Sequence, residues 1–323
     1  MGCRLGRRAS LLKCRTRQSE LLILLRRRRK NTADTSGGAD TRGAYAAGGN
    51  VLITGASSGI GRATAVYLAA CGFDVIATSR DASRLDGLLA EAAGLSGSIN
   101  GVELDINSDA EVARVVPTLI ERRGAMEALV NNAGFGLWGP VETLSDAELK
   151  AQFETNFFAA VRMTQAALPA MIQRRRGTIV NISSVLGRLG TPFNGAYVSS
   201  KFALEGISES LKTEVQPFGV RVTMVEPGLF RTNFPDNTIR GAEADGESVY
   251  SPYIGRYHLN RDMFHRFGGD PARVARVVHK VITSPAPNFR NPVGIDARSA
   301  TLAARVLPER VFWRILSKAT MRH

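Results

Sequence analysis

A tyrosine and a lysine one helical turn apart are the residues of this sequence best suited to chemistry. Tyr197 and Lys201 bound the run YVSSK, inside a stretch, 195–216, whose pattern predicts a helix, so both side chains share one helix face. A phenol titrates near ~10, which is too high for a base at neutral pH. We expect the ammonium to favour the phenolate and lower the Tyr197 pKa. Tyr197 would then exchange a proton with a substrate oxygen.

A serine stands where the strand expected before that helix ends. Ser184 closes the run GTIVNISS, thirteen residues before Tyr197, and its hydroxyl could hydrogen-bond the same substrate oxygen. Tyrosine–lysine pairs at this spacing also arise by chance on many helices. The pair therefore gains meaning only from the elements around it.

A glycine-rich turn precedes the first expected helix. The run TGASSGIG, 54–61, follows the short apolar run 51–54. Its glycines let the backbone turn tightly, and a helix N-terminus offers free N–H groups and the positive end of a dipole. The spacing is G-x-x-x-G-x-G rather than G-x-G-x-x-G. The strand–turn–helix context predicts a pyrophosphate site, and an ordinary glycine-rich turn is the alternative.

The end of the second strand bears on which dinucleotide binds. NAD sites commonly place an acid there for the ribose 2′-hydroxyl, whereas here strand 73–78 is followed by Ser79, Arg80 and Asp81. Arg80 could pair with a 2′-phosphate, since guanidinium matches phosphate geometry. We therefore expect NADP(H) to be preferred over NAD(H). A solvated surface arginine is the alternative.

Apolar runs and helical stretches alternate along the body of the chain. Strands are expected at 51–54, 73–78, 98–104, 126–131, 177–183, 220–227 and 292–296. Capping boxes at Ser108 and Ser145 open helices, the second of which should run to about Arg176; Pro271 is expected to open another. The amphipathic stretch 308–321 is expected to pack on the body of the protein. The pattern predicts an α/β fold: a single Rossmann-type, doubly wound parallel sheet with helices on both faces.

Composition and charge exclude several classes of protein. The 323 residues are 44% hydrophobic and 22% charged, so a collagen-like, fully disordered or multi-span membrane protein is excluded. Residues 1–50 hold 12 basic and 3 acidic side chains of a total net charge of +13, so nucleic-acid binding over the whole surface is not expected. Residues 1–48 are expected to be a basic, disordered extension and linker, and 49–323 the folded domain.

Three cysteines bear on compartment and metal content. Cys3, Cys14 and Cys71 fit neither a disulfide framework nor a zinc site, which favours a reducing, cytoplasmic location. His258 and His265 lack the spacing of metal ligands. We expect no metal.

The motifs together resemble one family. From about Asn50 to Thr232 the sequence resembles a classical short-chain dehydrogenase/reductase. The matching pieces, in the family's order and spacing, are TGASSGIG (54–61), Asp105, NNAG (131–134), Asn156, NISS (181–184), YVSSK (197–201) and Pro227-Gly228 with Thr232. The run 193–206 is similar, more locally, to the 17β-hydroxysteroid and retinol dehydrogenase branch.

The resemblance implies roles for individual residues. Ser184 would polarise the substrate carbonyl, Tyr197 would be the acid/base, and Lys201 would bind the nicotinamide ribose. Asn156 would bind a water through a local helix distortion and extend a proton relay from Lys201. The expected cofactor contacts are Gly55, Ser57, Ser58, Gly59, Ile60, Gly61, Arg80, Asp105, Asn132, Ala133, Tyr197, Lys201, Pro227, Gly228 and Thr232.

Substrate and partners are less closely defined. The branch similarity implies a lipophilic alcohol, ketone or aldehyde (steroid-, retinoid- or acyl-like), with Phe193 and Asn194 near it and a substrate loop at 233–270. Side chains that could line an apolar pocket, or equally pack in the core, are Phe135, Trp138, Leu186, Phe193, Leu229 and Phe230. A 3-oxoacyl-type reductase and a non-catalytic dinucleotide sensor are the alternatives. By analogy with the family we expect a homo-oligomer, dimer or tetramer; peripheral membrane contact is possible but not favoured.

Overall fold

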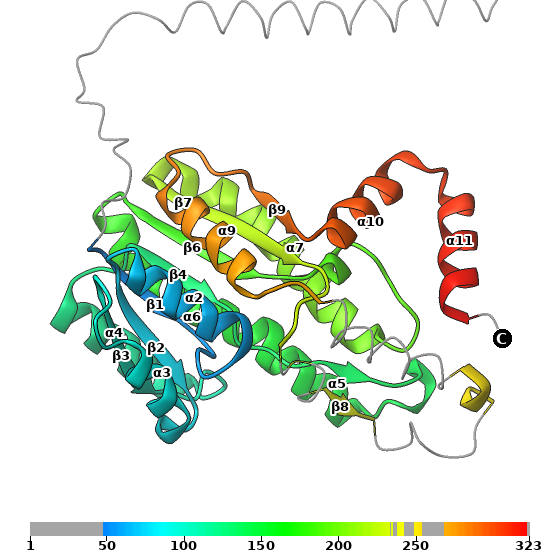
Figure 1. Ribbon diagram of the computed structural model, residues 1–323, viewed down its shortest axis with the longest axis horizontal. Helices are drawn as coiled ribbons and strands as arrows, with labels where there is room; N and C mark the ends of the chain where they lie inside the picture. The colour runs from blue at the N-terminus through cyan, green and yellow to red at the C-terminus, as the bar shows by residue number, and fades with distance from the viewer. Residues whose placement is uncertain (1–47, 233, 235–237, 242–248, 254–267, 322–323) are drawn as a thin grey trace, which may run out of the picture. The chain divides into compact units, whose positions relative to one another are not determined.

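The centre of the molecule is a parallel β-sheet. The computed structural model describes residues 48–232, 234, 238–241, 249–253 and 268–321. Within these residues the large sheet has seven strands in the order β3-β2-β1-β4-β6-β7-β9, all parallel (Figure 1). They are β1 (Asn50–Ile53), β2 (Asp74–Ser79), β3 (Ser98–Glu103), β4 (Ala128–Asn131), β6 (Gly177–Ile182), β7 (Val220–Pro227) and β9 (Arg290–Val293).

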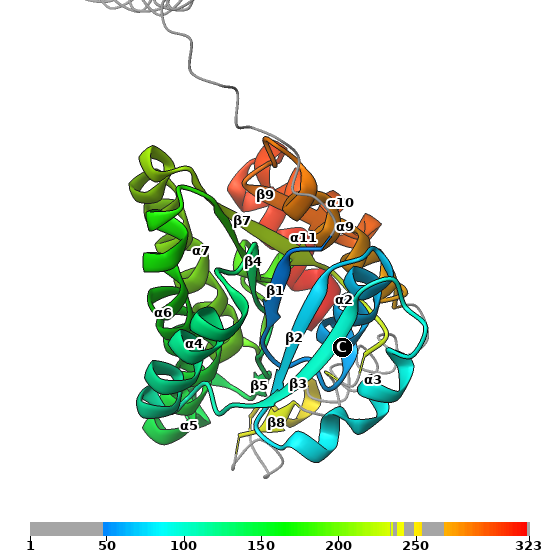
Figure 2. The same cartoon turned by 90° about the vertical axis from the view of Figure 1, so that its left-hand side faces the viewer.

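Helices cover both faces of this sheet, as the sequence predicts. Figure 2 shows α4, α6 and α7 on one face, and α2, α3 and α9 on the other. Their bounds are α2 (Gly59–Ala70), α3 (Asp86–Glu91), α4 (Asp109–Arg123), α6 (Ala159–Gln173), α7 (Gly195–Val215) and α9 (Ala272–Thr283). The fold is the expected doubly wound α/β arrangement.

The first strand shows why two layers form. Val51 and Ile53 pack into the core cluster shared with α2 and α9, whereas Leu52, between them, packs into the cluster shared with α4 and α6. Successive side chains of a strand point to opposite faces. Because each of the three is fully buried, β1 needs a helical layer on either side, as parallel sheets generally do.

The strand order places the sequence motifs at one edge of the sheet. β1 pairs with β2 on one side and β4 on the other. Strands β2 and β3 are therefore added on one side of β1 and the later strands on the other, so the strand order reverses at β1. In such sheets ligands bind in the crevice beyond the carboxyl ends of the strands. The segments that follow β1, β4, β6 and β7 are 54–61, 132–134, 183–184 and 228–232.

The helix expected from Ser145 to Arg176 is interrupted. It consists of α5 (Asp146–Phe153), one π-helical turn (Glu154–Phe158) and α6. The Ser145 capping box is present. At Ser108 the box is half formed, because the Glu111 carboxylate accepts from the backbone N–H of Asp105 instead. The π-turn is the local helix distortion that the resemblance implied around Asn156.

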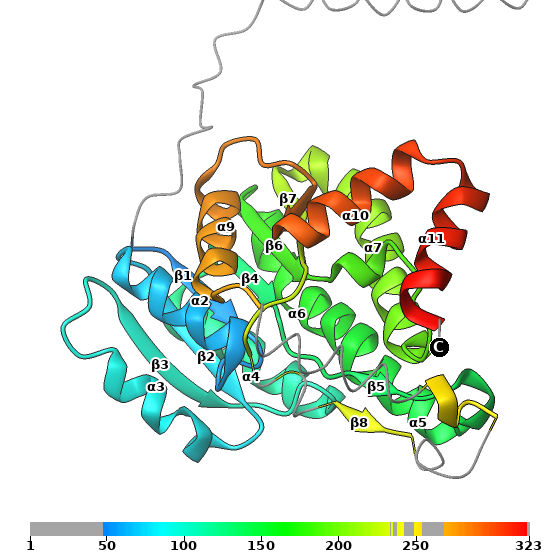
Figure 3. The ribbon, with the colours of Figure 1, turned by 45° about the vertical axis from the view of Figure 1, so that its right-hand side comes forward.

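The C-terminal region differs most from expectation. The last strand of the sheet ends at Val293, because Gly294 turns at φ 109° and α10 (Ile295–Val306), which was not predicted, follows. Figure 3 shows α10 and α11 (Glu309–Met321) on the side of the sheet where β9 is the edge. The expected apolar face of 308–321 is only partly covered. Phe312 and Leu316 are half-buried, whereas Ile315 is 55% exposed.

A smaller element lies beside the sheet. The short strands β5 (Leu137–Trp138) and β8 (Ile239–Arg240) pair in parallel. Four 3-10 turns occur in the described ranges, η1 (Ala82–Leu85), η2 (Val141–Thr143), η4 (Val185–Gly187) and η5 (Gln216–Phe218). None of the helices in those ranges is long and apolar enough to cross a bilayer.

Candidate active site

The glycine-rich turn is shaped to receive a phosphate. Gly55 and Gly59 have left-handed backbones, φ 65° and 56°, and a Cβ on Gly55 would come 2.8 Å from the Cα of Ala133. Ser58, the N-cap of α2, is extended and makes no side-chain cap hydrogen bond. The first N–H groups of α2 are thus not capped by Ser58, and the turn fits a dinucleotide pyrophosphate.

The NNAG segment holds this turn in place. The Asn132 amide donates to the carbonyl oxygens of Thr54 (2.9 Å) and Gly55 (3.0 Å), while the Thr54 hydroxyl accepts from the N–H groups of Asn132 and Ala133. The neighbouring Asn131 amide donates to Asn181 on β6. The Asn132 side chain therefore fixes the glycine turn from behind.

The tip of β2 presents an arginine beside an acid that is already engaged. Arg80 is exposed directly after the strand. The Asp81 carboxylate accepts from the Ser83 hydroxyl (2.6 Å) and N–H (3.0 Å), and these bonds hold the pKa of Asp81 below its ordinary value. At the end of β3, the Asp105 carboxylate accepts from the N–H of Asn107.

The segment after β7 closes the crevice from the other side. Pro227 ends the strand, and the N–H of Gly228 donates to the Val293 carbonyl at 2.9 Å. Thr232 approaches the glycine turn so closely that a Cβ on Gly59 would lie 3.3 Å from its Cβ. The turn and the 227–232 segment therefore face each other across the expected cofactor site.

Tyr197 and Lys201 lie together on α7, buried beside the end of β6. Their exposed fractions are 8% and 5%. The Lys201 ammonium donates to the Ile182 carbonyl at 2.9 Å and lies 5.8 Å from the centre of the Tyr197 ring. Ser184 hydrogen-bonds the phenol, and its hydroxyl also accepts from the N–H of Leu186. Three of the four expected catalytic side chains thus meet at one point.

The protonation of this pair differs from the prediction. Burial raises the pKa of Tyr197 to about 12, with the Ser184 hydrogen bond acting against it. Burial also lowers the pKa of Lys201 to about 8, opposed by the charge of Glu205. The expectation that Lys201 lowers the Tyr197 pKa is therefore wrong, because the desolvation of the buried phenol outweighs the effect of the neighbouring ammonium. At neutral pH the phenol keeps its proton.

Asn156 joins the π-turn to the catalytic helix. Its side chain, 1% exposed, accepts from the N–H of Phe135 and donates to the Phe135 carbonyl and the Ser200 hydroxyl, all at 3.0–3.1 Å. Ser200 in turn donates to the Tyr197 carbonyl. The π-turn aims Asn156 at the residue beside Lys201. Such turns frequently occur at functional sites.

Aromatic side chains lie near the start of α7, the helix that carries Tyr197. The Phe234 ring stands edge-on to the Tyr197 ring at 5.4 Å. Phe193, with a strained φ of 61°, lies between Trp138 (5.7 Å) and Tyr250 (6.1 Å). Phe234 falls within the expected substrate loop 233–270 but was not singled out there, because its contact with Tyr197 is made only by the fold.

Other expected pocket residues are divided between the site and the core. Trp138 and Phe230 are buried, Phe230 in the cluster under α2 and α9. Phe135, Leu186 and Leu229 are half-buried. Tyr257, His258 and His265 of the expected substrate loop lie outside the described residues. In the described ranges no cluster of three or more His, Cys, Asp or Glu could hold a metal ion.

Comparison with known proteins agrees with this geometry. The short chain dehydrogenase family model matches residues 49–242. Retinol dehydrogenase 8 of Bos taurus is 41% identical over 253 residues, 74% of this chain and 80% of the relative. The 3-ketodihydrosphingosine reductase of Bacteroides thetaiotaomicron is 37% identical over 244 residues, 76% of this chain and 87% of the relative. A solved metagenomic short-chain oxidoreductase in complex with NADP is 29% identical, with a TM-score of 0.61 over 77% of this chain and 97% of the other.

The chain belongs to the short-chain dehydrogenase family. The family match covers more than half of its residues, and the similarity to retinol dehydrogenase confirms the branch expected from 193–206. It is an oxidoreductase that uses a nicotinamide dinucleotide and acts on CH–OH groups.

Proposed function

We propose that the protein interconverts a lipophilic alcohol and its ketone or aldehyde with NADP(H), and that Tyr197 is the acid/base. The observation that carries the proposal is the meeting of Tyr197, Ser184 and Lys201 at the carboxyl edge of the sheet. A hydroxyl, a phenol and an ammonium converge there beside a turn that fits a pyrophosphate.

The protonated phenol is the form that carbonyl reduction requires. With a pKa of about 12, Tyr197 can give its proton to the substrate oxygen while Ser184 donates a second hydrogen bond to the same atom. When bound, the reduced nicotinamide supplies the hydride to the carbonyl carbon. Lys201 would hold the nicotinamide ribose, and Asn156 would connect Lys201 to the water that returns the proton to Tyr197.

A preference for NADP(H) is supported by the charge at the tip of β2. Arg80 is exposed there, and the adjacent Asp81 carboxylate is tied into its own turn by Ser83. A 2′-phosphate would meet the guanidinium, while the ionised Asp81 carboxylate is engaged by the N–H and hydroxyl of Ser83. The similar solved structure bound to NADP supports the same choice.

A lipophilic substrate is supported by the aromatic side chains near the start of α7. Phe234 contacts the catalytic ring, and Phe193 stands between Trp138 and Tyr250. Apolar and aromatic linings bind substrates that bury apolar surface. The relatives named for retinol and 3-ketodihydrosphingosine point to the same substrate class.

The experiment combines nucleotide binding with turnover. NADPH and NADH oxidation are followed at saturating retinal, a steroid ketone and a 3-keto long-chain base, in the wild-type protein and Tyr197→Phe. We expect NADPH-dependent reduction of at least one carbonyl, a loss of about 10²-fold or more in Tyr197→Phe, and unchanged NADPH binding. Turnover retained by Tyr197→Phe overturns the assigned acid. Tight NADPH binding with no turnover on any carbonyl favours a nucleotide sensor instead.

A further inference from the structure

A buried carboxylate that the reaction does not use lies behind the catalytic lysine. Glu205 follows Lys201 by one turn of α7, on the same face of the helix. The two residues are 4% and 5% exposed. An ionised group in such a place is costly unless it is paired, so the partners of Glu205 indicate what holds it there.

Arg290 on β9 anchors this carboxylate. Its Nε lies 3.0 Å from one Glu205 oxygen, and its Nη1 lies 2.7 Å from Glu209, one further turn along α7. The same Nε is 3.5 Å from Glu226, buried on β7. The guanidinium fork thus fixes the Glu205 side chain between the catalytic helix and the edge strand.

The second Glu205 oxygen faces the turn that carries Ser184. In the described part of the chain, neither this oxygen nor the buried Ser183 hydroxyl has a hydrogen-bond partner. Both border Gly187, where an added Cβ would lie 2.5 Å from Ser183 Oγ and 3.5 Å from that Glu205 oxygen. Glu205, which lies on α7 with Tyr197 and Lys201, therefore packs against η4, the turn that begins directly after Ser184.

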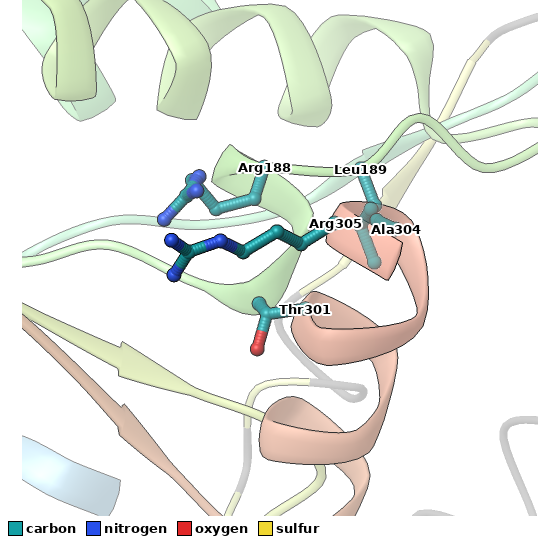
Figure 4. Close-up of a pocket in the computed structure, with 5 residues that line it drawn as sticks. All are labelled: Arg188, Leu189, Thr301, Ala304 and Arg305. Carbon is teal, nitrogen blue, oxygen red and sulfur yellow. The ribbon is translucent and has the colours of Figure 1, made fainter. Parts of the chain in front are cut away.

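The remaining charges around Glu205 are nearly balanced. Glu226 pairs with Arg188, which follows η4, at 3.4 Å. Arg188 also lines a cavity of about 240 Å³, together with Leu189, Thr301, Ala304 and Arg305 (Figure 4). The group of charged side chains around Glu205 thus borders a cavity on the side of α10. Burial and Glu205 raise the pKa of Glu226 to about 7, so this carboxyl is only partly ionised at neutral pH. Glu205 and Glu209 therefore supply most of the negative charge that faces Lys201, Arg188 and Arg290. Removing Glu205 leaves the cations in excess beside the lysine.

We propose that Glu205 is a positioning residue for the catalytic lysine: its Arg290-anchored carboxylate supplies the negative charge that keeps the buried Lys201 ammonium protonated. Burial lowers the pKa of Lys201 to about 8, and the charge of Glu205 is what opposes this fall. Losing it would bring Lys201 to its neutral form within the physiological range. The inference rests on the proposed function, in which Lys201 acts as a cation.

Glu205→Gln tests this charge with little change in shape, and Glu209→Gln is the matched control. Glu209 also pairs with Arg290, but it is 57% exposed and lies a turn further from Lys201. The measurement is the pH dependence of kcat/KM for carbonyl reduction between pH 6 and 10. In Glu205→Gln we expect the alkaline limb to move to lower pH by about one unit. Glu209→Gln should keep the wild-type limb, and Glu205→Asp should restore most of it.

A titration without turnover separates this inference from the proposed function. The ¹³C-NMR signal of the Lys201 side chain, assigned by its absence in Lys201→Arg, reports the ammonium pKa directly. We expect it to fall in folded Glu205→Gln and to stay unchanged in Glu209→Gln. An unmoved Lys201 titration in Glu205→Gln overturns the inference, whether or not the protein reduces any carbonyl. Absent turnover with a shifted titration overturns only the proposed function.

Discussion

Gly59 and Thr232 lie directly against each other at the expected cofactor site. A methyl group on Gly59 would stand 3.3 Å from the threonine Cβ, although one residue follows β1 and the other follows β7. The turn expected to hold the pyrophosphate and the segment expected to hold the carboxamide therefore set the width of the site together. A substitution at Gly59 or at Thr232 should therefore change the space available to the cofactor.

Gly59→Ala should weaken nucleotide binding much more than it weakens the fold. Its φ of 56° costs a residue with a Cβ about 1–2 kcal/mol, and the new methyl presses on Thr232. We expect the Kd for NADPH, from fluorescence titration, to rise about tenfold or more, with a small fall in Tm.

Gly206→Ala is the control for this substitution. Gly206 lies on α7 with open space around its missing side chain, so alanine there should be neutral or stabilise the protein by up to about 1 kcal/mol. If Gly59→Ala binds NADPH as tightly as the wild type, the assignment of the glycine turn to the cofactor site is wrong.

Motifs that follow strand ends were predictable because each depends on local sequence. The turn 54–61, NNAG, and the strand ending at Ser184 each lie where an apolar run stops. Parallel pairing then brings those ends to one edge. The four-residue separation of Tyr197 and Lys201 puts them on one face of a helix, so their relative placement could also be predicted from the sequence.

Contacts made by tertiary packing were not predictable. The helix distortion at Asn156 was expected only from the family resemblance, since no local feature between Ser145 and Arg176 indicates the π-turn. The bonds of Asn156 to Phe135 and Ser200 exist only in the fold. The Tyr197 pKa was expected to fall, because spacing shows a nearby lysine but not the depth of burial. Helix α10 was missed because only Ala297 of it is buried, which leaves a weak apolar pattern.

Asn156→Ala should damage both stability and turnover. It removes three hydrogen bonds from a fully buried side chain and leaves the Phe135 backbone groups with fewer partners. We expect a loss of about 2–3 kcal/mol in the free energy of unfolding by urea denaturation. Because the π-turn then loses its tie to Ser200, kcat should fall more than NADPH affinity.

Asn100→Ala is the matched control for the asparagine. Asn100 lies on β3, away from α7, and its side-chain amide donates to Ser98 two residues earlier on the same strand, so its loss should cost no more than about 1 kcal/mol. Equal effects of the two substitutions would argue that Asn156 has no special link to the catalytic helix.

Arg80→Ala should discriminate between the two dinucleotides. If the guanidinium pairs with a 2′-phosphate, the Kd for NADPH should rise about tenfold or more while that for NADH changes little. Arg84→Ala, an equally exposed arginine on η1, should leave both unchanged. Parallel weakening of NADPH and NADH by Arg80→Ala would contradict the assigned specificity.

Glu226 should make the stability of the protein fall as pH rises towards 7. Burial and the neighbouring Glu205 raise the pKa of Glu226 to about 7 from an ordinary value of 4.5. Below pH 4.5 the carboxyl is protonated in both the folded and unfolded chains and costs nothing. Between pH 4.5 and 7 the unfolded chain releases its proton first, so the unfolded state gains stability; above pH 7 the penalty is constant.

Urea denaturation of the wild type and Glu226→Gln at pH 5, 6, 7 and 8 measures this penalty. We expect the free energy of unfolding of the wild type, minus that of Glu226→Gln, to decrease from pH 5 to 7 and then level off. Glu209→Gln is the control, because Arg290 lowers the pKa of Glu209 from its ordinary value of 4.5. The stabilisation by the Glu209 carboxylate is lost only as pH falls below 4.5. The free energy of unfolding of Glu209→Gln should therefore run parallel to that of the wild type at these four pH values. Parallel curves for Glu226→Gln would mean that this carboxyl is ionised throughout, and that Arg188 and Arg290 fully offset its burial.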